Sequence, residues 1–141
     1  NMKYSELKKS LKNHKLRITD CRMDVLEHFQ QEKKALSFKD LEDRFHEYDR
    51  VTLYRTLHSF TENGLLHKIP GDSGSAIYGL CEDCDVEAHH HNHMHFKCNY
   101  CGTTECIDIP INIPSISLPA DYEMTDMDVI INGVCKECHS N

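Results

Sequence analysis

Closely spaced cysteines and histidines in the second half of the chain constrain its fold more than any other feature. The 26-residue stretch 81–106 contains five cysteines and five histidines, and another C-x2-C pair follows at 135–138. Two C-x2-C pairs, with 33 residues between them, form a potential ligand set: Cys98, Cys101, Cys135 and Cys138. Four thiolates are the closed tetrahedral arrangement of a structural zinc. We therefore predict that zinc at these residues closes the intervening loop and contributes folding free energy.

The remaining histidines predict a second metal site. In a strand, alternate residues share a face, so His93 and His95 can bind one ion. An earlier arm of the chain, carrying His67 and Cys81, supplies further candidate ligands. Such a site would join the two halves of the chain, and its occupancy would change their relative position.

The charges are distributed unevenly along the 141 residues. Residues 1–68 contain 14 Lys and Arg against 11 Asp and Glu, whereas residues 69–141 contain two against 12. A basic face attracts phosphate, and an acidic Cys/His-rich half suits divalent cations. The chain has no evident signal peptide and no apolar run of about 20 residues, so we expect a reducing cytoplasmic location without a membrane partner.

The first half predicts four helices followed by a hairpin. Leu7 and Leu11 mark the buried face of the first helix, and Thr19 is the expected N-cap of the second. Cys21 is expected in the core, where a free cysteine behaves as a small apolar residue. A capping box at 37–40 starts the third helix.

The fourth helix is expected from about residue 49 to 63, with Val51, Tyr54, Leu57 and either Phe60 or Thr61 facing the core and Gly64 ending the helix. Apolar runs at 65–69 and 76–80 flank a Gly-rich turn and predict a hairpin. Helices closed by a hairpin suggest a winged helix-turn-helix, whose recognition helix would bring four residues near a major groove. They are Arg50, Thr52, Tyr54 and Arg55.

The second half predicts a small sheet. Apolar and polar residues alternate at 107–109, 111–113 and 116–118, and another apolar run covers 128–134. Prolines at 110, 114 and 119 exclude a long helix there. The fold class is therefore α+β, with a winged-helix DNA-binding domain at 2–80 and a zinc-stapled, β-rich domain at 81–141.

Five motifs in order resemble the ferric uptake regulator family of metal-responsive repressors. They are L-R-I-T at 16–19, V-T-L-Y-R-T-L at 51–57, N-G-L-L-H-K at 63–68, H-x-H-x2-C-x2-C-G at 93–102 and G-V-C-x2-C at 133–138. The resemblance implies a homodimer, with residues 81–141 as the dimerisation domain, that binds an AT-rich palindromic DNA operator. By matching position, Arg17 would approach the minor groove.

The sensed metal is inferred from departures from this family pattern. Iron and peroxide sensors of the family place a histidine near Ala35 and a carboxylate at the position of Cys106, which has Glu105 beside it. The strand end at 78–81, with His67 upstream, resembles the zinc uptake regulator branch. Softer ligands favour zinc over Fe(II). The expected regulatory ligands are His67, Cys81, His93, His95 and Cys106, with Glu105 and His91 as rivals.

Three alternatives to a zinc-sensing repressor stay open. An iron- or peroxide-sensing repressor would share the fold. A zinc hydrolase needs an open metal position and a general base, and the sequence contains neither H-E-x-x-H nor H-x-E…C-x2-C. A thiol oxidoreductase using Cys81 and Cys84 is disfavoured by the acidic residues between them, which raise thiol pKa values. We therefore expect neither enzymatic activity nor a small-molecule substrate.

Overall fold

The computed structural model describes residues 2–70, 75–80, 93–107, 117–125 and 127–140. The chain forms two compact units, Asn1–His89 (unit 1) and His90–Asn141 (unit 2). The domain boundary that the sequence predicts, after residue 80, falls at the edge of the stretch 81–92, which lies outside the described residues. No helix in the described ranges has the length and apolar character needed to cross a bilayer.

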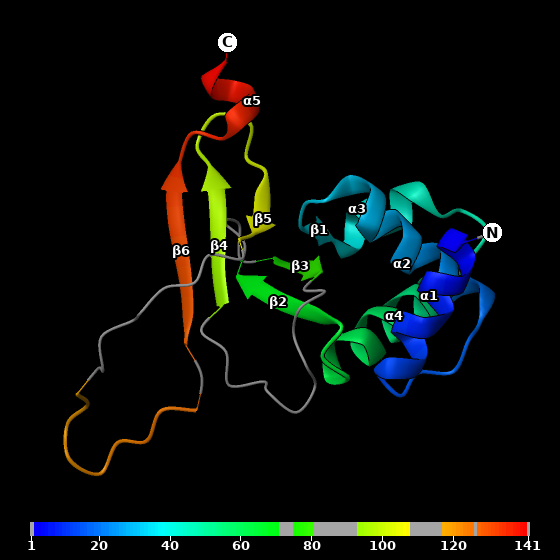
Figure 1. Ribbon diagram of the computed structural model, residues 1–141, viewed down its shortest axis with the longest axis horizontal. Coiled ribbons are helices and arrows are strands. Elements are labelled where there is room, and N and C mark those ends of the chain that lie inside the picture. The colour runs from blue at the N-terminus through cyan, green and yellow to red at the C-terminus, as the bar shows by residue number, and fades with distance from the viewer. Residues whose placement is uncertain (1, 71–74, 81–92, 108–116, 126, 141) are drawn as a thin grey trace. The chain divides into compact units, whose positions relative to one another are not determined.

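Unit 1 consists of four helices and a small antiparallel sheet, as Figure 1 shows. The sheet has the strand order β1-β3-β2, with Leu66 opposite Leu80 and Leu36 opposite Tyr78. The hairpin of β2 and β3 confirms the predicted wing, whereas β1 was not predicted. The elements are α1 (Met2–Asn13), α2 (Asp20–Glu32), β1 (Leu36–Ser37), α3 (Phe38–Arg44), α4 (Arg50–Glu62), β2 (Leu66–Pro70) and β3 (Ala76–Leu80).

Local hydrogen bonds set the helix ends of unit 1. The Thr19 side chain caps α2 by accepting from the Arg22 amide. Ser37 and Asp40 form the reciprocal capping box of α3. The α4 N-cap is Asp49, and Gly64 follows the helix with φ +80°, a conformation that favours glycine. These ends confirm the capping predictions.

The α4 helix packs on the core through a face that only partly matches the prediction: Leu57 and Phe60 are buried as expected, but Val51 and Tyr54 are not. Its buried residues include Leu53, Leu57 and Phe60, whereas Val51 is 58% exposed and Tyr54 is 55% exposed. At 3.6 residues per turn, Val51 lies about 160° around the helix from Leu53. The prediction that Val51 and Tyr54 face the core was therefore wrong, and both are available at the surface.

The core of unit 1 joins all four helices to the sheet. It is built mainly from Leu, Val, Phe, Met and Cys side chains of the helices together with residues of β1, β2 and β3. Leu7 and Leu11 are buried as predicted, and Cys21 is buried with its sulfur 3.4 Å from Thr56 Oγ1. The predicted assignment of Cys21 to the core is confirmed.

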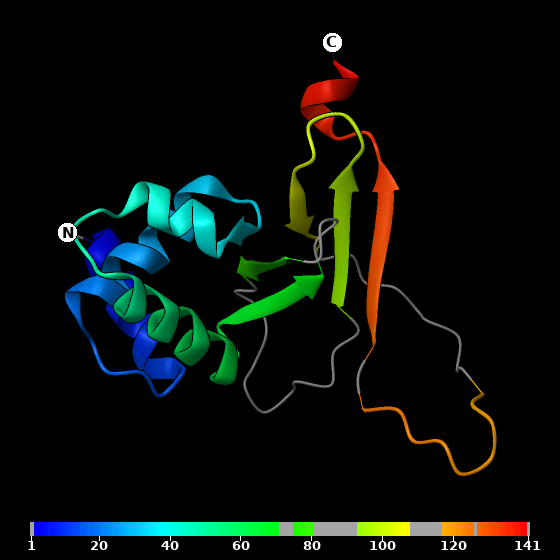
Figure 2. The ribbon, with the colours of Figure 1, turned by 180° about the vertical axis from the view of Figure 1, so that it is seen from behind.

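Unit 2 is a three-stranded sheet with the order β5-β4-β6 (Figure 2). Its elements are β4 (His93–Cys98), β5 (Thr104–Cys106), β6 (Asp128–Gly133) and α5 (Lys136–His139). The β4 strand pairs antiparallel with β5 and parallel with β6. The strand predicted at 128–134 is confirmed, and β5 was not predicted. Residues 107, 117 and 118 are not in strands, so that part of the prediction was wrong, and residues 108–116 lie outside the described residues.

Candidate metal centre

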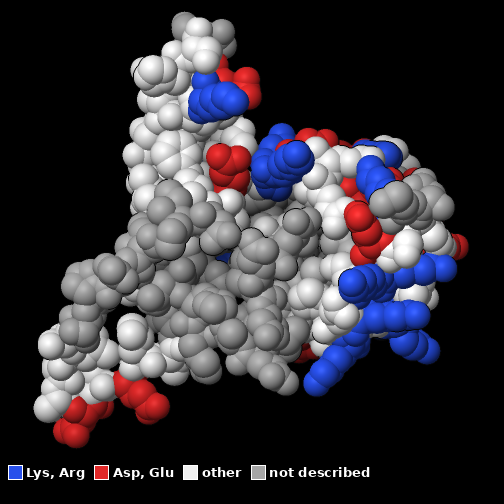
Figure 3. All heavy atoms as spheres, in the orientation of Figure 1, with Lys and Arg blue, Asp and Glu red and all other residues white. Residues whose placement is uncertain are grey.

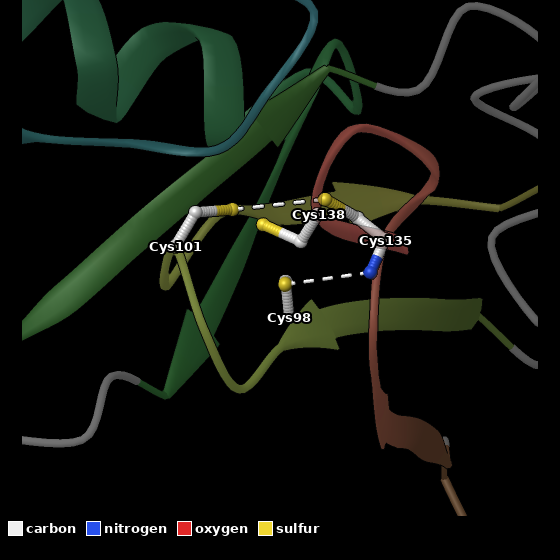
Figure 4. Close-up of side chains that lie close together, drawn as sticks. All are labelled: Cys98, Cys101, Cys135 and Cys138. Atoms are coloured by element: carbon white, nitrogen blue, oxygen red, sulfur yellow. Dashed lines mark hydrogen bonds between the residues drawn. The ribbon is translucent and has the colours of Figure 1, made fainter. Parts of the chain in front are cut away.

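Four cysteine sulfurs of unit 2 converge on one point. The Sγ atoms of the two C-x2-C pairs all lie within 4.8 Å of one another. Figure 4 shows the four side chains directed toward a common centre, with 3.8 Å between the sulfurs of Cys101 and Cys135. The two pairs come from opposite ends of the unit's sequence. The residues are Cys98, Cys101, Cys135 and Cys138.

Strand pairing and a tight turn bring the two pairs together. Cys98 is the last residue of β4, and its register partner in β6 is Gly133, two residues before Cys135. The Asn99 amide donates to the Gly133 carbonyl at 2.8 Å, and the Gly102 amide donates to the Cys98 carbonyl at 3.0 Å. Gly102 has φ +75°, which favours glycine and closes the turn after Cys101.

Hydrogen bonds to sulfur make the four thiols unequal. The backbone amides of Cys101 and Cys135 lower the pKa of Cys98 to about 6. The hydrogen bond with Thr103, whose Oγ1 lies 3.2 Å from the Cys101 sulfur, lowers the pKa of Cys101. The contact with Cys135, and then those with the other sulfurs, raise the pKa of Cys138 to about 12. These shifts favour the thiolate at Cys98 and the protonated thiol at Cys138.

The donor set fits a tetrahedral zinc ion. Zinc–sulfur bonds of about 2.3 Å place tetrahedral sulfurs about 3.8 Å apart, which is the observed Cys101–Cys135 separation. A dication at the centre would stabilise four thiolates and displace the proton from Cys138. Sequence reasoning missed Thr103, whose only signal is its position two residues after a ligand cysteine.

The β4–β5 pair places two further candidate ligands opposite each other. His95 and Cys106 are register partners, and directly opposed residues of an antiparallel pair lie on the same face, about 5 Å apart. The His95 side chain is 1% exposed and Cys106 is half-buried. Glu105 is exposed and faces Phe96 in the register, so it belongs to the other face.

The other predicted regulatory ligands are not brought together by the described part of the chain. His67 is a buried residue of β2 in unit 1. His93 occupies the first position of β4, but its side chain lies outside the description. Cys81 and His91 also fall in the stretch that is not described. Their membership in the site stays a prediction.

Four of the five candidate DNA-binding residues lie on α4, and the fifth, Arg17, lies in the segment before α2. Arg50, Tyr54 and Arg55 are exposed, and Thr52 is half-buried with its amide donating to Asp49 at 2.7 Å. Arg17 is exposed in the segment before α2, and its carbonyl accepts from the Arg22 guanidinium at 2.9 Å. These contacts order the backbone at both positions.

Basic side chains add a positive surface to unit 1. Figure 3 shows Lys and Arg gathered on the side of unit 1 that carries α1. The α1 sequence contains four lysines, at positions 3, 8, 9 and 12, and one acidic residue, Glu6. Lys3, Lys9 and Lys12 are exposed, and exposed lysines on one helix form a surface suited to a polyanion.

Comparison with known proteins places the chain in one family. The model of the ferric uptake regulator family matches residues 13–132. The ferric uptake regulation protein of Staphylococcus aureus is 32% identical over 135 residues, which cover 92% of this chain and 93% of that protein.

Two solved structures share the fold. A zinc uptake regulator complexed with zinc and DNA has a TM-score of 0.67 at 20% identity, covering 97% of this chain and 93% of that one. Holo XcZur has a TM-score of 0.68 at 19% identity, covering 98% and 97%. A family model that spans most of the chain and a relative above 30% identity agree with the fold and the cysteine cluster. This chain is therefore a member of the ferric uptake regulator family of metal-responsive transcriptional regulators.

Proposed function

We propose that this protein is a zinc-responsive repressor that binds operator DNA as a homodimer. Residues 2–80 form the DNA-binding domain of this proposal, and residues 81–141 form the metal-binding and dimerisation domain. The four-cysteine cluster holds a structural zinc. A second, exchangeable zinc controls DNA binding and thereby the expression of metal-uptake genes.

The opposed pair of His95 and Cys106 carries the proposed preference for zinc. An imidazole and a thiolate on one sheet face are softer ligands than the imidazole and carboxylate that the family's iron sensors use at this position, and softer ligands favour zinc over Fe(II). The β4–β5 register supports Cys106 over its rival Glu105, because Glu105 is on the opposite face.

The proposed regulatory ligands extend to both units. His67, Cys81 and His93 complete the set with His95 and Cys106, and His91 is a rival for one histidine position. When bound, zinc supplies a positive charge and fixed ligand geometry. Ligands drawn from two units couple metal occupancy to the arrangement of those units, which is the physical basis of the proposed switch.

The proposed DNA contacts follow from exposure and charge. Arg55 and Arg50 supply guanidinium groups for base edges or phosphates, and Tyr54 and Thr52 add apolar and hydroxyl contacts from the same helix. Arg17 approaches the minor groove. The structural likeness to a zinc uptake regulator solved with zinc and DNA supports this role for α4.

An iron-sensing repressor is the second candidate. The relative named ferric uptake regulation protein, at 32% identity, favours it. The two candidates share the fold and the DNA surface, and they differ in the metal that restores DNA binding.

The experiment measures DNA affinity as a function of metal. The zinc-loaded protein first selects its preferred duplex from a random library. The protein is then treated with a mild chelator that leaves the four-cysteine zinc in place, and affinity for the selected duplex is measured by fluorescence anisotropy at fixed salt with Zn²⁺, Fe²⁺ or Mn²⁺ added. We expect zinc to increase affinity about 5- to 150-fold, the usual range for allosteric coupling.

Two adjacent substitutions sharpen the assignment. Cys106→Ser is expected to remove most of the zinc response, whereas Glu105→Gln, its matched control on the other face of β5, is expected to keep it. Restoration by iron and not by zinc would replace the zinc sensor with the second candidate. Equal affinity with and without every metal would refute a metal-responsive repressor.

A further inference from the structure

The Phe38 side chain connects the core of unit 1 to the exposed face of α4. Phe38 is the first residue of α3 and is half-buried against the core cluster. Two side chains of α4 reach it from the surface side. The Tyr54 ring meets it in a T-shaped contact, with ring centroids 5.8 Å apart and planes at 87°. The Arg50 guanidinium lies over the same ring, 5.4 Å from its centroid.

Each of these two side chains has a second contact that restricts it further. Tyr54 lies parallel to the His58 ring, with centroids 6.5 Å apart, and His58 in turn lies 3.0 Å from Glu62. Arg50 Nε lies 3.7 Å from a Glu42 carboxylate oxygen. Both side chains are thus exposed to solvent and yet supported on more than one side.

Such support affects binding through conformational entropy. An exposed arginine or tyrosine normally samples several rotamers and loses this freedom when it binds. A side chain already restrained by ring contacts loses less, and its functional group is presented in a narrower range of directions. Base edges are read through short, directional contacts, whereas phosphates are contacted with looser geometry. Restraint therefore favours sequence discrimination more than overall affinity.

We propose that Phe38 is a positioning residue that orients Arg50 and Tyr54 of α4 for sequence-specific DNA recognition. This inference rests on the proposed DNA-binding function of α4 and adds a determinant of specificity to it. Phe38 acts through its contacts with the two α4 side chains and needs no contact with DNA. A single ring of α3 thus supports two recognition side chains one turn apart on the next helix.

The test separates discrimination from affinity. Affinities of zinc-loaded wild type and Phe38→Leu are measured for the selected duplex and for a scrambled duplex of equal length and composition, over a series of salt concentrations. We expect the ratio of the two affinities to fall about 3- to 10-fold in Phe38→Leu, given the usual strength of aromatic and cation–π contacts. The affinity for scrambled DNA and its salt dependence should stay unchanged, because phosphate contacts dominate both.

Three further variants control for a purely structural role. Phe38→Tyr retains the ring and is expected to retain discrimination. Phe38→Met retains apolar volume without a ring and is expected to behave like Phe38→Leu. Phe45→Leu is the matched control: Phe45 is buried in the same unit, and its described aromatic and cation–π contacts are with His28, Tyr48 and Arg44. It is expected to lower the unfolding temperature while keeping the affinity ratio.

The outcomes distinguish this inference from the proposed function. The inference alone would be overturned if the wild type prefers the selected duplex and the ringless Phe38 variants keep the same affinity ratio. This outcome requires that those variants are folded at the assay temperature. A parallel loss of ratio in Phe45→Leu would also overturn it, because instability would then be the cause. A wild type without any sequence preference would refute the proposed function itself.

Discussion

Replacing one cysteine of the cluster should unfold unit 2 and leave unit 1 intact. In Cys135→Ser, the zinc loses one of four thiolates, and serine is a poor ligand for zinc compared with cysteine. The loop that the metal closes between Cys101 and Cys135 has 33 intervening residues. Loop-closure entropy for a cross-link of this span is about 4 kcal/mol.

Unit 2 has little else to offset such a loss. In the part of unit 2 that the structure describes, the buried apolar side chains are those of Met94 and Cys98, and the large core cluster belongs to unit 1. A unit of this size has a typical free energy of unfolding of about 3–8 kcal/mol. Loss of about 4 kcal/mol therefore removes half or more of the stability.

Two spectroscopic signals separate the units. Helices α1 to α4 belong to unit 1, so circular dichroism at 222 nm reports mainly on that unit, whereas backbone amide resonances of β4 to β6 report on unit 2. In Cys135→Ser, we expect the helical signal and its denaturation midpoint to persist. The dispersed amide resonances of unit 2 should collapse, and bound zinc should fall by about one ion per chain.

Cys106→Ser is the matched control, since this cysteine lies in unit 2 but outside the cluster. It should retain the amide dispersion of unit 2 and the structural zinc. Unchanged zinc content together with an unchanged unfolding midpoint for unit 2 in Cys135→Ser would refute the assignment of the cluster as a metal-dependent staple.

Three further predictions concern unit 1. Burial lowers the pKa of His28 in the folded state, so the unfolded chain, in which histidine has a pKa of about 6.5, binds more protons as the pH falls through that value. The free energy of unfolding should therefore decrease over this pH range. Denaturant titrations at pH 7.5 and 5.5 should show a smaller decrease in His28→Gln than in wild type, and an equal decrease would exclude His28 as a cause of the pH dependence. Gly64→Ala should cost about 1 kcal/mol at φ +80°, with the exposed helix substitution Ser5→Ala as a near-neutral control. Ser37→Ala removes half of the capping box and should also cost about 1 kcal/mol, measurable as a lower urea midpoint; no change would show that the cap is dispensable.

Local chemistry explains why much of unit 1 was predictable. Thr19, the capping box and Gly64 act through neighbouring backbone groups, so their effect is encoded within a few residues. The two C-x2-C pairs were equally informative, since the spacing of each pair restricts the positions of its two sulfurs. These features required no knowledge of distant partners.

Features that depend on partners distant in the sequence were less predictable. The two-residue strand β1 exists because it pairs with β3, more than 35 residues later, and β5 exists because it pairs with β4. Half of the predicted buried face of α4 was wrong, because Val51 and Tyr54 also follow an apolar period with Leu57. Tertiary packing buries Leu53 together with Leu57 and Phe60 and leaves Val51 and Tyr54 exposed. The pairing of His95 with Cys106 depends on register, which periodicity alone cannot specify.

The parallel pairing of β4 with β6 has a consequence for synthesis on the ribosome. The partner strand β6 and half of the cysteine cluster lie within residues 128–138. The central strand β4 is therefore synthesised with one edge unpaired, and Cys98 and Cys101 are synthesised before the other two cysteines of the cluster. The described helices and strands of unit 1 end at Leu80, so this unit can fold well before residues 128–138 are made. A chain that ends after residue 107 would contain every described element of unit 1, but only two strands of the unit 2 sheet and two of the four cluster cysteines. Metal can therefore close unit 2 only after the last cysteine pair has been made.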